Sequence, residues 1–275
     1  TPLSDDPVFL AVPATWDYDT VLLNTVHDKQ IRVMNVGGGN LGVDSVNISG
    51  SPFISLLDLP TLPASLATGQ MITFTVRYNP TAVGEHDAVI TITDDQAVTR
   101  RVGSRSSRIA HTVTIAGECI DPTITTLPYL QTFDAVSEPA IPIQWSSIIG
   151  AGSPGTIGTA ASDAFTAPNH AFLYNQENNA LPLILIAPPY ATDIQTNTTR
   201  VKFYGMSYST GATVDLGVMT NPQDPTSFTL IQSVTLNTVW TEHIVSFGAY
   251  TGAGKYIAFR HGNTSTYQRI MLDNV

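Results

Sequence analysis

The stretch Lys255–Val275 reads KYIAFRHGNTSTYQRIMLDNV and is the clearest structural signal in the chain. Ile257 and Phe259 occupy alternate positions, which is the period of a β-strand with one apolar face. The polar residues 261–263 (HGN) interrupt this run, and a second run begins at Arg269. The stretch therefore predicts a closing hairpin, that is, two strands joined by a polar turn.

Size and composition extend this β prediction to the whole molecule. The chain has 275 residues, of which 43% are hydrophobic and 12% are charged, and this balance excludes a disordered chain. Thr, Val, Ile, Gly and Pro dominate, and no stretch has the pattern of an amphipathic helix of several turns. We predict an all-β protein that is long enough for two domains.

Charge, hydropathy and cysteine content narrow the partners and compartments. The net charge of −10 argues against a nucleic-acid partner, because phosphate binding needs a cationic surface. The longest apolar run, Ala180–Pro188, is shorter than the ~18–20 residues of a membrane span, so we expect no membrane insertion. The single cysteine, Cys119, cannot form an internal disulfide, which fits either a reducing compartment or an exported domain stabilised by core burial alone.

Residues 7–120 are predicted to form the first domain, after a polar tail of residues 1–6 that is disordered or processed. Strand-like segments follow one another closely, and turn-forming residues such as Asn79-Pro80 separate them. In Met71–Tyr78 the apolar residues fall on alternate positions. Seven short strands with this spacing predict an immunoglobulin-like sandwich.

Six segments of this first domain occur in a characteristic order: Ile31–Gly37 (IRVMNVG), Leu41–Val43 (LGV), Pro52-Phe53, Leu66–Gly69 (LATG), Tyr78–Gly84 and Ile115–Gly117 (IAG). Their order resembles the abnormal-spindle/hydin type of immunoglobulin-like domain, called choice-of-anchor D in bacteria. The resemblance implies a spacer or docking module and brings no catalytic residues with it.

Residues 121–275 are predicted to form the second domain. Eight or more strands with long loops fit a jelly-roll sandwich of the concanavalin or galactose-binding type. The opening segment Leu127–Trp145 (LPYLQTFDAVSEPAIPIQW) and the closing stretch Lys255–Val275 resemble the two ends of the cleaved-adhesin (choice-of-anchor J) jelly rolls of secreted, Bacteroides-type surface proteins. The resemblance implies an exported protein, at the bacterial outer membrane or outside the cell.

The same resemblance implies a structural calcium ion. In the family, backbone carbonyls and acids on the first and last strands ligate the ion, and the matching acids here are Asp134 and Asp273. Thr132 and Asn274 stand where the family often has further acids, and fewer carboxylates mean weaker binding. The alternative is that Asp134 and Asp273 accept hydrogen bonds from loop amides.

Aromatic residues are the candidates for ligand contact. Tyr190 and Tyr267 lie on predicted loops, so we expect them to be available to a ligand. Trp145 and Trp240 occupy packing positions of the family and are predicted to lie in the core.

Sequence motifs for catalysis are scarce. Gly205–Ser209 (GMSYS) is one residue short of a nucleophile elbow and lies in a predicted strand, where that motif does not function. The six histidines have no metal-ligand spacing. We predict a non-enzymatic adhesion module that binds a carbohydrate or an extracellular protein. Two alternatives stay open: ancillary domains of a secreted hydrolase, most plausibly a peptidase, whose catalytic domain is elsewhere, or a purely structural stalk.

Overall fold

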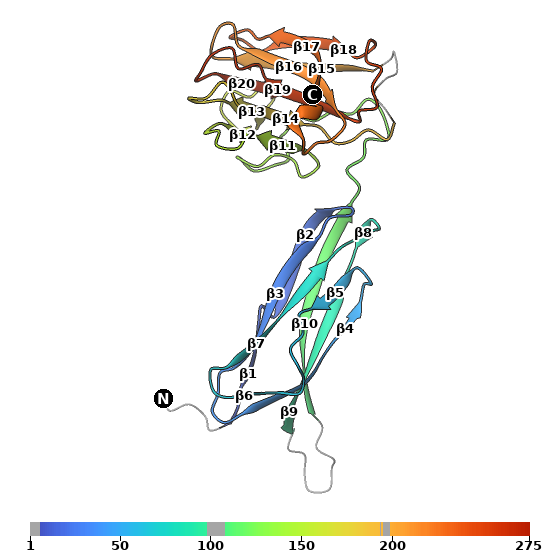
Figure 1. Ribbon diagram of the computed structural model, residues 1–275, viewed down its shortest axis with the longest axis vertical. Helices are drawn as coiled ribbons and strands as arrows, with labels where there is room; N and C mark the ends of the chain where they lie inside the picture. The colour runs from blue at the N-terminus through green and yellow to red at the C-terminus, as the bar shows by residue number, and fades with distance from the viewer. Residues whose placement is uncertain (1–5, 98–107, 193, 195–198) are drawn as a thin grey trace. The chain divides into compact units, whose positions relative to one another are not determined.

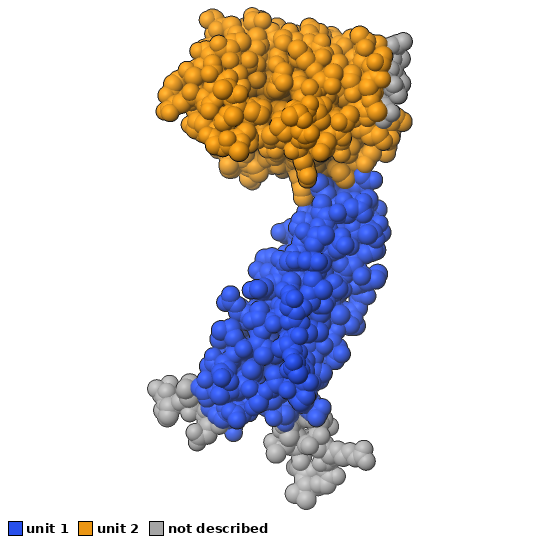
Figure 2. All heavy atoms as spheres, in the orientation of Figure 1, with its two compact units in different colours: residues 1–121 blue, residues 122–275 orange. Residues whose placement is uncertain are grey.

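The computed structural model describes residues 6–97, 108–192, 194 and 199–275. It confirms the all-β prediction: strands dominate, and the described residues contain one short 3₁₀ turn, Pro225–Ser227, and no α-helix. No helix there is long and apolar enough to cross a membrane. The chain divides into two compact units, Thr1–Asp121 (unit 1) and Pro122–Val275 (unit 2), coloured separately in Figure 2.

Unit 1 contains two β-sheets. The first has the order β1 (Phe9–Val12), β3 (His27–Asn35), β7 (Met71–Tyr78) and β5 (Ile54–Leu57). The second has the order β2 (Thr15–Leu22), β10 (Arg108–Ile120), β9 (Ala88–Ala97), β4 (Leu41–Gly50) and β6 (Ala64–Leu66), with β8 (Gly84–Glu85) also paired to β10. Most neighbours are antiparallel, but β2 and β10 are parallel. Apolar side chains of both sheets form one buried cluster, so unit 1 is a β-sandwich.

A buried asparagine, Asn35, explains the polar residue within the segment Ile31–Gly37 of unit 1. Asn35, at the end of β3, is completely buried, and a buried amide needs partners for all its polar atoms. Its Oδ1 accepts from the backbone N–H of Val8 and Gly37, both at 3.1 Å. Its Nδ2 donates to the carbonyls of Gly39 and Leu66, both at 3.0 Å. Asn35 thereby fixes the glycine-rich turn that leads into β4.

Unit 2 is also a sandwich of two sheets, each with five strands. One sheet has the order β11 (Ser146–Ile149), β14 (Leu183–Ile186), β19 (Tyr256–His261), β16 (Thr213–Met219) and β17 (Thr229–Thr235). The other has the order β12 (Thr156–Ala160), β13 (His170–Tyr174), β20 (Arg269–Asp273), β15 (Arg200–Ser207) and β18 (Thr241–Ser246). All of these neighbours pair antiparallel.

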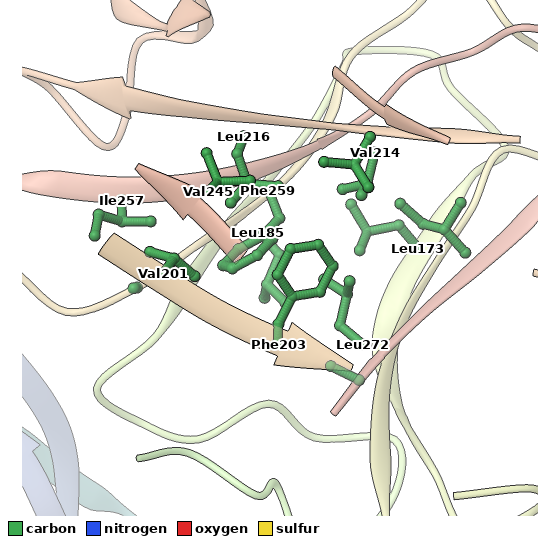
Figure 3. Close-up of a cluster of buried hydrophobic side chains, with 14 of the residues drawn as sticks. Leu173, Leu185, Val201, Phe203, Val214, Leu216, Val245, Ile257, Phe259 and Leu272 are labelled. Carbon is green, nitrogen blue, oxygen red and sulfur yellow. The ribbon is translucent and has the colours of Figure 1, made fainter. Parts of the chain in front are cut away.

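The core of unit 2 lies between its two sheets. Figure 3 shows Leu185, Leu216 and Phe259 of the first sheet meeting side chains of the second. The partners from the second sheet include Leu173, Val201, Phe203, Val245 and Leu272. Each of these strands contributes alternate residues, as expected of strands with one face turned inward.

The predicted closing hairpin is wrong in its pairing. β19 and β20 are both strands, but β19 lies at the centre of one sheet and β20 at the centre of the other. The polar segment between them therefore crosses from sheet to sheet. It is held by Asn175, whose amide donates to the carbonyl of Ser265 at 2.6 Å and accepts from the N–H of Gln268 at 2.9 Å. The strand pattern was visible in the sequence, whereas this crossing depends on partners far along the chain.

Candidate functional site

Unit 2 has a groove of about 640 Å³ at one end of the sandwich. Its wall comes from both sheets and from the segment that precedes β11. The lining residues are Leu127, Pro128, Tyr129, Leu130, Trp145, Ala187, Tyr190, Thr199, Arg200, Val201, Lys202, Ile244, Ile257, Phe259, Asn274 and Val275. The volume lies within the usual range of small-molecule sites.

Aromatic side chains form the inner part of this groove. Trp145 is buried, and its Nε1 donates to the hydroxyl of Tyr129 at 3.0 Å. Its ring stacks with that of Phe259, at 6.4 Å between centroids. This arrangement confirms that Trp145 is a packing residue, and it leaves Tyr129 and Tyr190 as the half-buried aromatic rings of the groove.

Tyr190 is fixed by its backbone. Its N–H donates to the carbonyl of Lys255 at 2.8 Å, and it forms a parallel β-bridge with Ile124. Burial raises the pKa of Tyr190 to about 12, with a further contribution from Tyr129. The hydroxyl therefore stays protonated at neutral pH and can donate a hydrogen bond to a ligand. The sequence-based choice of Tyr190 coincides with the groove.

The rim of the groove combines exposed apolar residues with two cations. Leu127, Leu130 and Ile244 are 61%, 65% and 53% exposed. Arg200 and Lys202 stand beside them on β15. None of these five rim residues had been singled out from the sequence. They are far apart along the chain and carry no common motif, so only the fold brings them together.

Tyr267, the other aromatic candidate, lies outside the groove. It is exposed in the segment that links β19 to β20, and its backbone φ is 57°. A hydrogen bond with Glu177 raises the pKa of its hydroxyl. The structure thus does not bring Tyr267 together with Tyr190, and a ligand role for Tyr267 stays a prediction.

Trp240 was predicted to lie in the core, but it is only half-buried. Its Nε1 donates to the carbonyl of Asp163 at 2.8 Å. Its ring lies 6.2 Å from that of Phe165, which in turn stacks on Tyr204 at 3.7 Å between centroids. Trp240 therefore packs beneath the loop that contains Asp163 and Phe165, on the outer side of the sheet.

Asp134 and Asp273 lie close together at a seam beside the groove. Asp273 is completely buried at the end of β20 and accepts from the N–H of Thr166 at 2.9 Å and of Asn274 at 2.7 Å. Asp134 accepts from the N–H of Asn169 at 3.0 Å. Both carboxylates therefore bind loop amides, which was the alternative interpretation of these two residues.

Electrostatics connect the two carboxyl groups. Burial raises the pKa of Asp273, and the negative charge of Asp134 raises it further, against the lowering effect of the amide hydrogen bonds. A divalent cation between the two groups would offset this repulsion. The calcium assignment agrees with the local chemistry in this respect.

Several side-chain oxygens at the seam are of the kind that ligates calcium. Besides the two carboxylates they include Oδ1 of Asn274 and the hydroxyl of Thr166, which lie 3.0 Å apart. Within the described ranges, no group of three or more His, Cys, Asp or Glu is placed to hold a metal. Asp134 and Asp273 would thus need main-chain carbonyls to complete a coordination shell.

The seam continues directly into the groove wall. Gln131 and Val275 exchange two backbone hydrogen bonds, N–H of Gln131 to the carbonyl of Val275 at 2.7 Å and the reverse at 2.9 Å. Asn274 and Val275 both line the groove. The seam and the groove wall therefore share Asn274 and are joined through Val275.

The second unit is thus a two-sheet β-sandwich with a groove at one end. A family model described as the Cleaved Adhesin Domain matches residues 188–275. The matched range includes Tyr190, Arg200 and Asp273 but not Asp134. The resemblance of residues 7–120 to the choice-of-anchor D family stays a prediction.

Solved structures similar to this chain include cleaved adhesin domains. The K2 cleaved adhesin domain of Lys-gingipain is 22% identical, with a TM-score of 0.42, over 53% of this chain and 96% of that one. The K3 cleaved adhesin domain of Lys-gingipain from Porphyromonas gingivalis is 16% identical, with a TM-score of 0.42, over 54% and 95%.

A carbohydrate-binding module is also among the similar structures. The CBM22-1 xylan-binding domain from Paenibacillus barcinonensis Xyn10C is 12% identical, with a TM-score of 0.36, over 53% of this chain and 89% of that one. No curated protein matches the chain.

Proposed function

We propose that this chain is a non-catalytic adhesion module of an exported bacterial surface protein and that unit 2 binds a glycan in its groove. The groove itself is the observation that carries the proposal. It offers a half-buried tyrosine surface, Tyr129 and Tyr190, next to hydrogen-bonding side chains such as Arg200 and Asn274. Sugar rings pack their apolar faces on aromatic rings while their hydroxyls hydrogen-bond around them.

The cleaved-adhesin match supports the adhesion part of this proposal, because the matched residues supply most of the groove's lining. Unit 1 acts in this proposal as a spacer that carries unit 2. At the seam, Asp134, Asp273 and Asn274 would hold a calcium ion. That ion would order the groove wall through the backbone pair Gln131–Val275.

A second candidate ligand is an extracellular protein. Leu127, Leu130 and Ile244 at the rim are well exposed and could pack on apolar side chains of a partner. Such a partner would bury all three residues, whereas a glycan would contact the inner tyrosine surface and, at the rim, Leu130, which follows Tyr129 in the chain.

The test is a binding screen with the full chain, in calcium, against arrayed glycans and purified extracellular-matrix proteins. Leu130→Ser changes an exposed residue of the groove, and Leu230→Ser is its matched control, because Leu230 is an exposed leucine of the same unit outside the groove. We expect Leu130→Ser to weaken capture and Leu230→Ser to leave it unchanged. Equal binding by both variants would show that the groove is not the binding site.

A further inference from the structure

We propose that the groove selects a sugar that carries a carboxylate, which Arg200 and Lys202 bind. This inference rests on the proposed glycan-binding function and assigns its ligand class. The inference starts from the distribution of charge in the chain. The chain has 12 Lys and Arg against 22 Asp and Glu, yet two cations and none of the described acids line the groove.

Arg200 is available for a ligand. It is exposed at the start of β15 and makes no ion pair with any residue in the described ranges. The planar guanidinium presents paired N–H donors that match the two oxygens of a carboxylate. A guanidinium without an ion-pair partner among the described residues, at the edge of a groove that none of the described acids lines, can bind an anion.

Lys202 adds a second positive charge on the same side of the strand, because residues two apart on a β-strand point the same way. Its Nζ lies 3.1 Å from Glu242, and the two side chains are 56% and 40% exposed. An ion pair this exposed contributes little free energy, so a ligand carboxylate can compete with Glu242 for Lys202.

The position of the cations relative to the tyrosine surface restricts the ligand further. Tyr129, Tyr190 and Leu130 provide the accessible apolar surface of the groove, and Arg200 and Lys202 line the same groove from β15. A ligand that uses both features has an apolar ring face and an acidic substituent. A uronic acid, a pyranose with a carboxylate on the ring, has this combination.

The experiment compares a panel of uronic-acid trisaccharides with their methyl esters, by calorimetric titration into the full chain. The ester keeps the sugar and removes the charge. We expect the acid to bind at least tenfold more tightly than its ester, since a charge-assisted hydrogen bond is lost. Raising the salt concentration should weaken binding of the acid and leave the ester unaffected.

Three variants locate the effect. Arg200→Gln should reduce the affinity for the acid to that for the ester, while Arg32→Gln, an exposed arginine of unit 1, should change neither. Glu242→Gln should raise the affinity for the uronic-acid sugar a few-fold, because it removes the carboxylate that competes for Lys202. A gain of affinity is not produced by misfolding, so this variant stays informative if Arg200→Gln is unstable.

The outcomes separate the two proposals. If acid and ester bind equally, and Leu130→Ser weakens both, glycan binding stands and the charge selection is wrong. If no sugar binds and a matrix protein does, the glycan proposal itself is wrong. If the acid binds more tightly but Arg200→Gln and Glu242→Gln have no effect, the carboxylate lies elsewhere and the inference fails.

Discussion

Unit 2 contains three histidines whose pKa values are lowered by burial. His170 is completely buried on β13, and neither of its ring nitrogens has a hydrogen-bond partner among the described residues. Burial and the positive charge of Arg269 lower the pKa of His170 to about 4, against an opposing effect of Asp163. Burial also lowers the pKa values of His243 and His261. All three imidazoles are therefore neutral in the folded protein at pH 7.

We expect unit 2 to lose stability as the pH falls from about 6.5 towards 4. Unfolded His170 takes up a proton near its ordinary pKa of 6.5, whereas folded His170 does so only near 4. Between these values the unfolded state binds more protons, so acid favours unfolding. The full pKa difference corresponds to roughly 3 kcal/mol. Urea unfolding at pH 7 and pH 5 measures the effect. His170→Leu should reduce the pH dependence but not abolish it, because His243 and His261 also contribute. An unchanged slope in that variant would rule out His170 as its source.

Calcium should raise the unfolding temperature of unit 2. A ligand that binds only the folded state stabilises it by about 2.7 kcal/mol at a hundredfold excess over its Kd. Asp134→Asn keeps the size of the side chain but removes one charge, so the calcium shift should shrink or vanish. Thermal unfolding with calcium and with excess chelator provides the measurement. If the two curves coincide in the unchanged protein, Asp134 and Asp273 serve only the amides of Thr166, Asn169 and Asn274.

At the scale of elements, the link between β19 and β20 depends on one buried amide. Asn175 is completely buried and bonds the carbonyl of Ser265, the side chain of Asn263 and the N–H of Gln268. His261 adds a bond from its ring to the carbonyl of Gln268, at 3.0 Å. The crossing between sheets is thus fixed by polar contacts inside the protein.

Asn175→Ala should lower the free energy of unfolding by roughly 2–4 kcal/mol. The change leaves the buried N–H of Gln268 and the carbonyl of Ser265 without their partner, and an unpaired buried backbone group costs about 1–3 kcal/mol. Asn237→Ala is the control, since Asn237 is exposed and should change stability by less than about 0.5 kcal/mol. Chemical denaturation of both variants tests this. Equal losses would mean that the crossing is held by its apolar neighbours.

The elements also show how far the sequence determines the fold. The alternation around Ile257 and Phe259 predicted a strand correctly, because that pattern is local. The assumption that β19 pairs with its successor in sequence was wrong, because β19 pairs with β14 and β16 in one sheet and β20 with β13 and β15 in the other. Trp240 was misassigned since the loop that half-covers it is rich in small residues and carries no signal of its packing.

At the scale of the whole molecule, the two units have separate cores that share no residue. The groove belongs to this scale as well, since Leu130, Arg200 and Ile244 come from distant segments of unit 2. Tyr190 could be chosen from the sequence as a loop aromatic. Arg200 and Lys202 could not be chosen from the sequence. They stand out only because none of the described acids lines the groove, and the groove forms only when the chain folds.

Separate cores predict separate sensitivity to mutation. Asn35→Ala removes four hydrogen bonds from a buried position of unit 1, and Asn175→Ala weakens unit 2. In differential scanning calorimetry each variant should lower the temperature of one unfolding transition and leave the temperature of the other unchanged. A shift of both peaks by either variant would contradict two independently folding cores.

The exchange of backbone hydrogen bonds between Gln131 and Val275 has a mechanical consequence. Two residues that bond reciprocally in this way are antiparallel neighbours. A force that separates Gln131 from Val275 therefore stretches these two hydrogen bonds first. Asp134 and Asp273 are the next acidic side chains along the two segments. A cation held between them would resist further separation and set the tension that this part of unit 2 withstands.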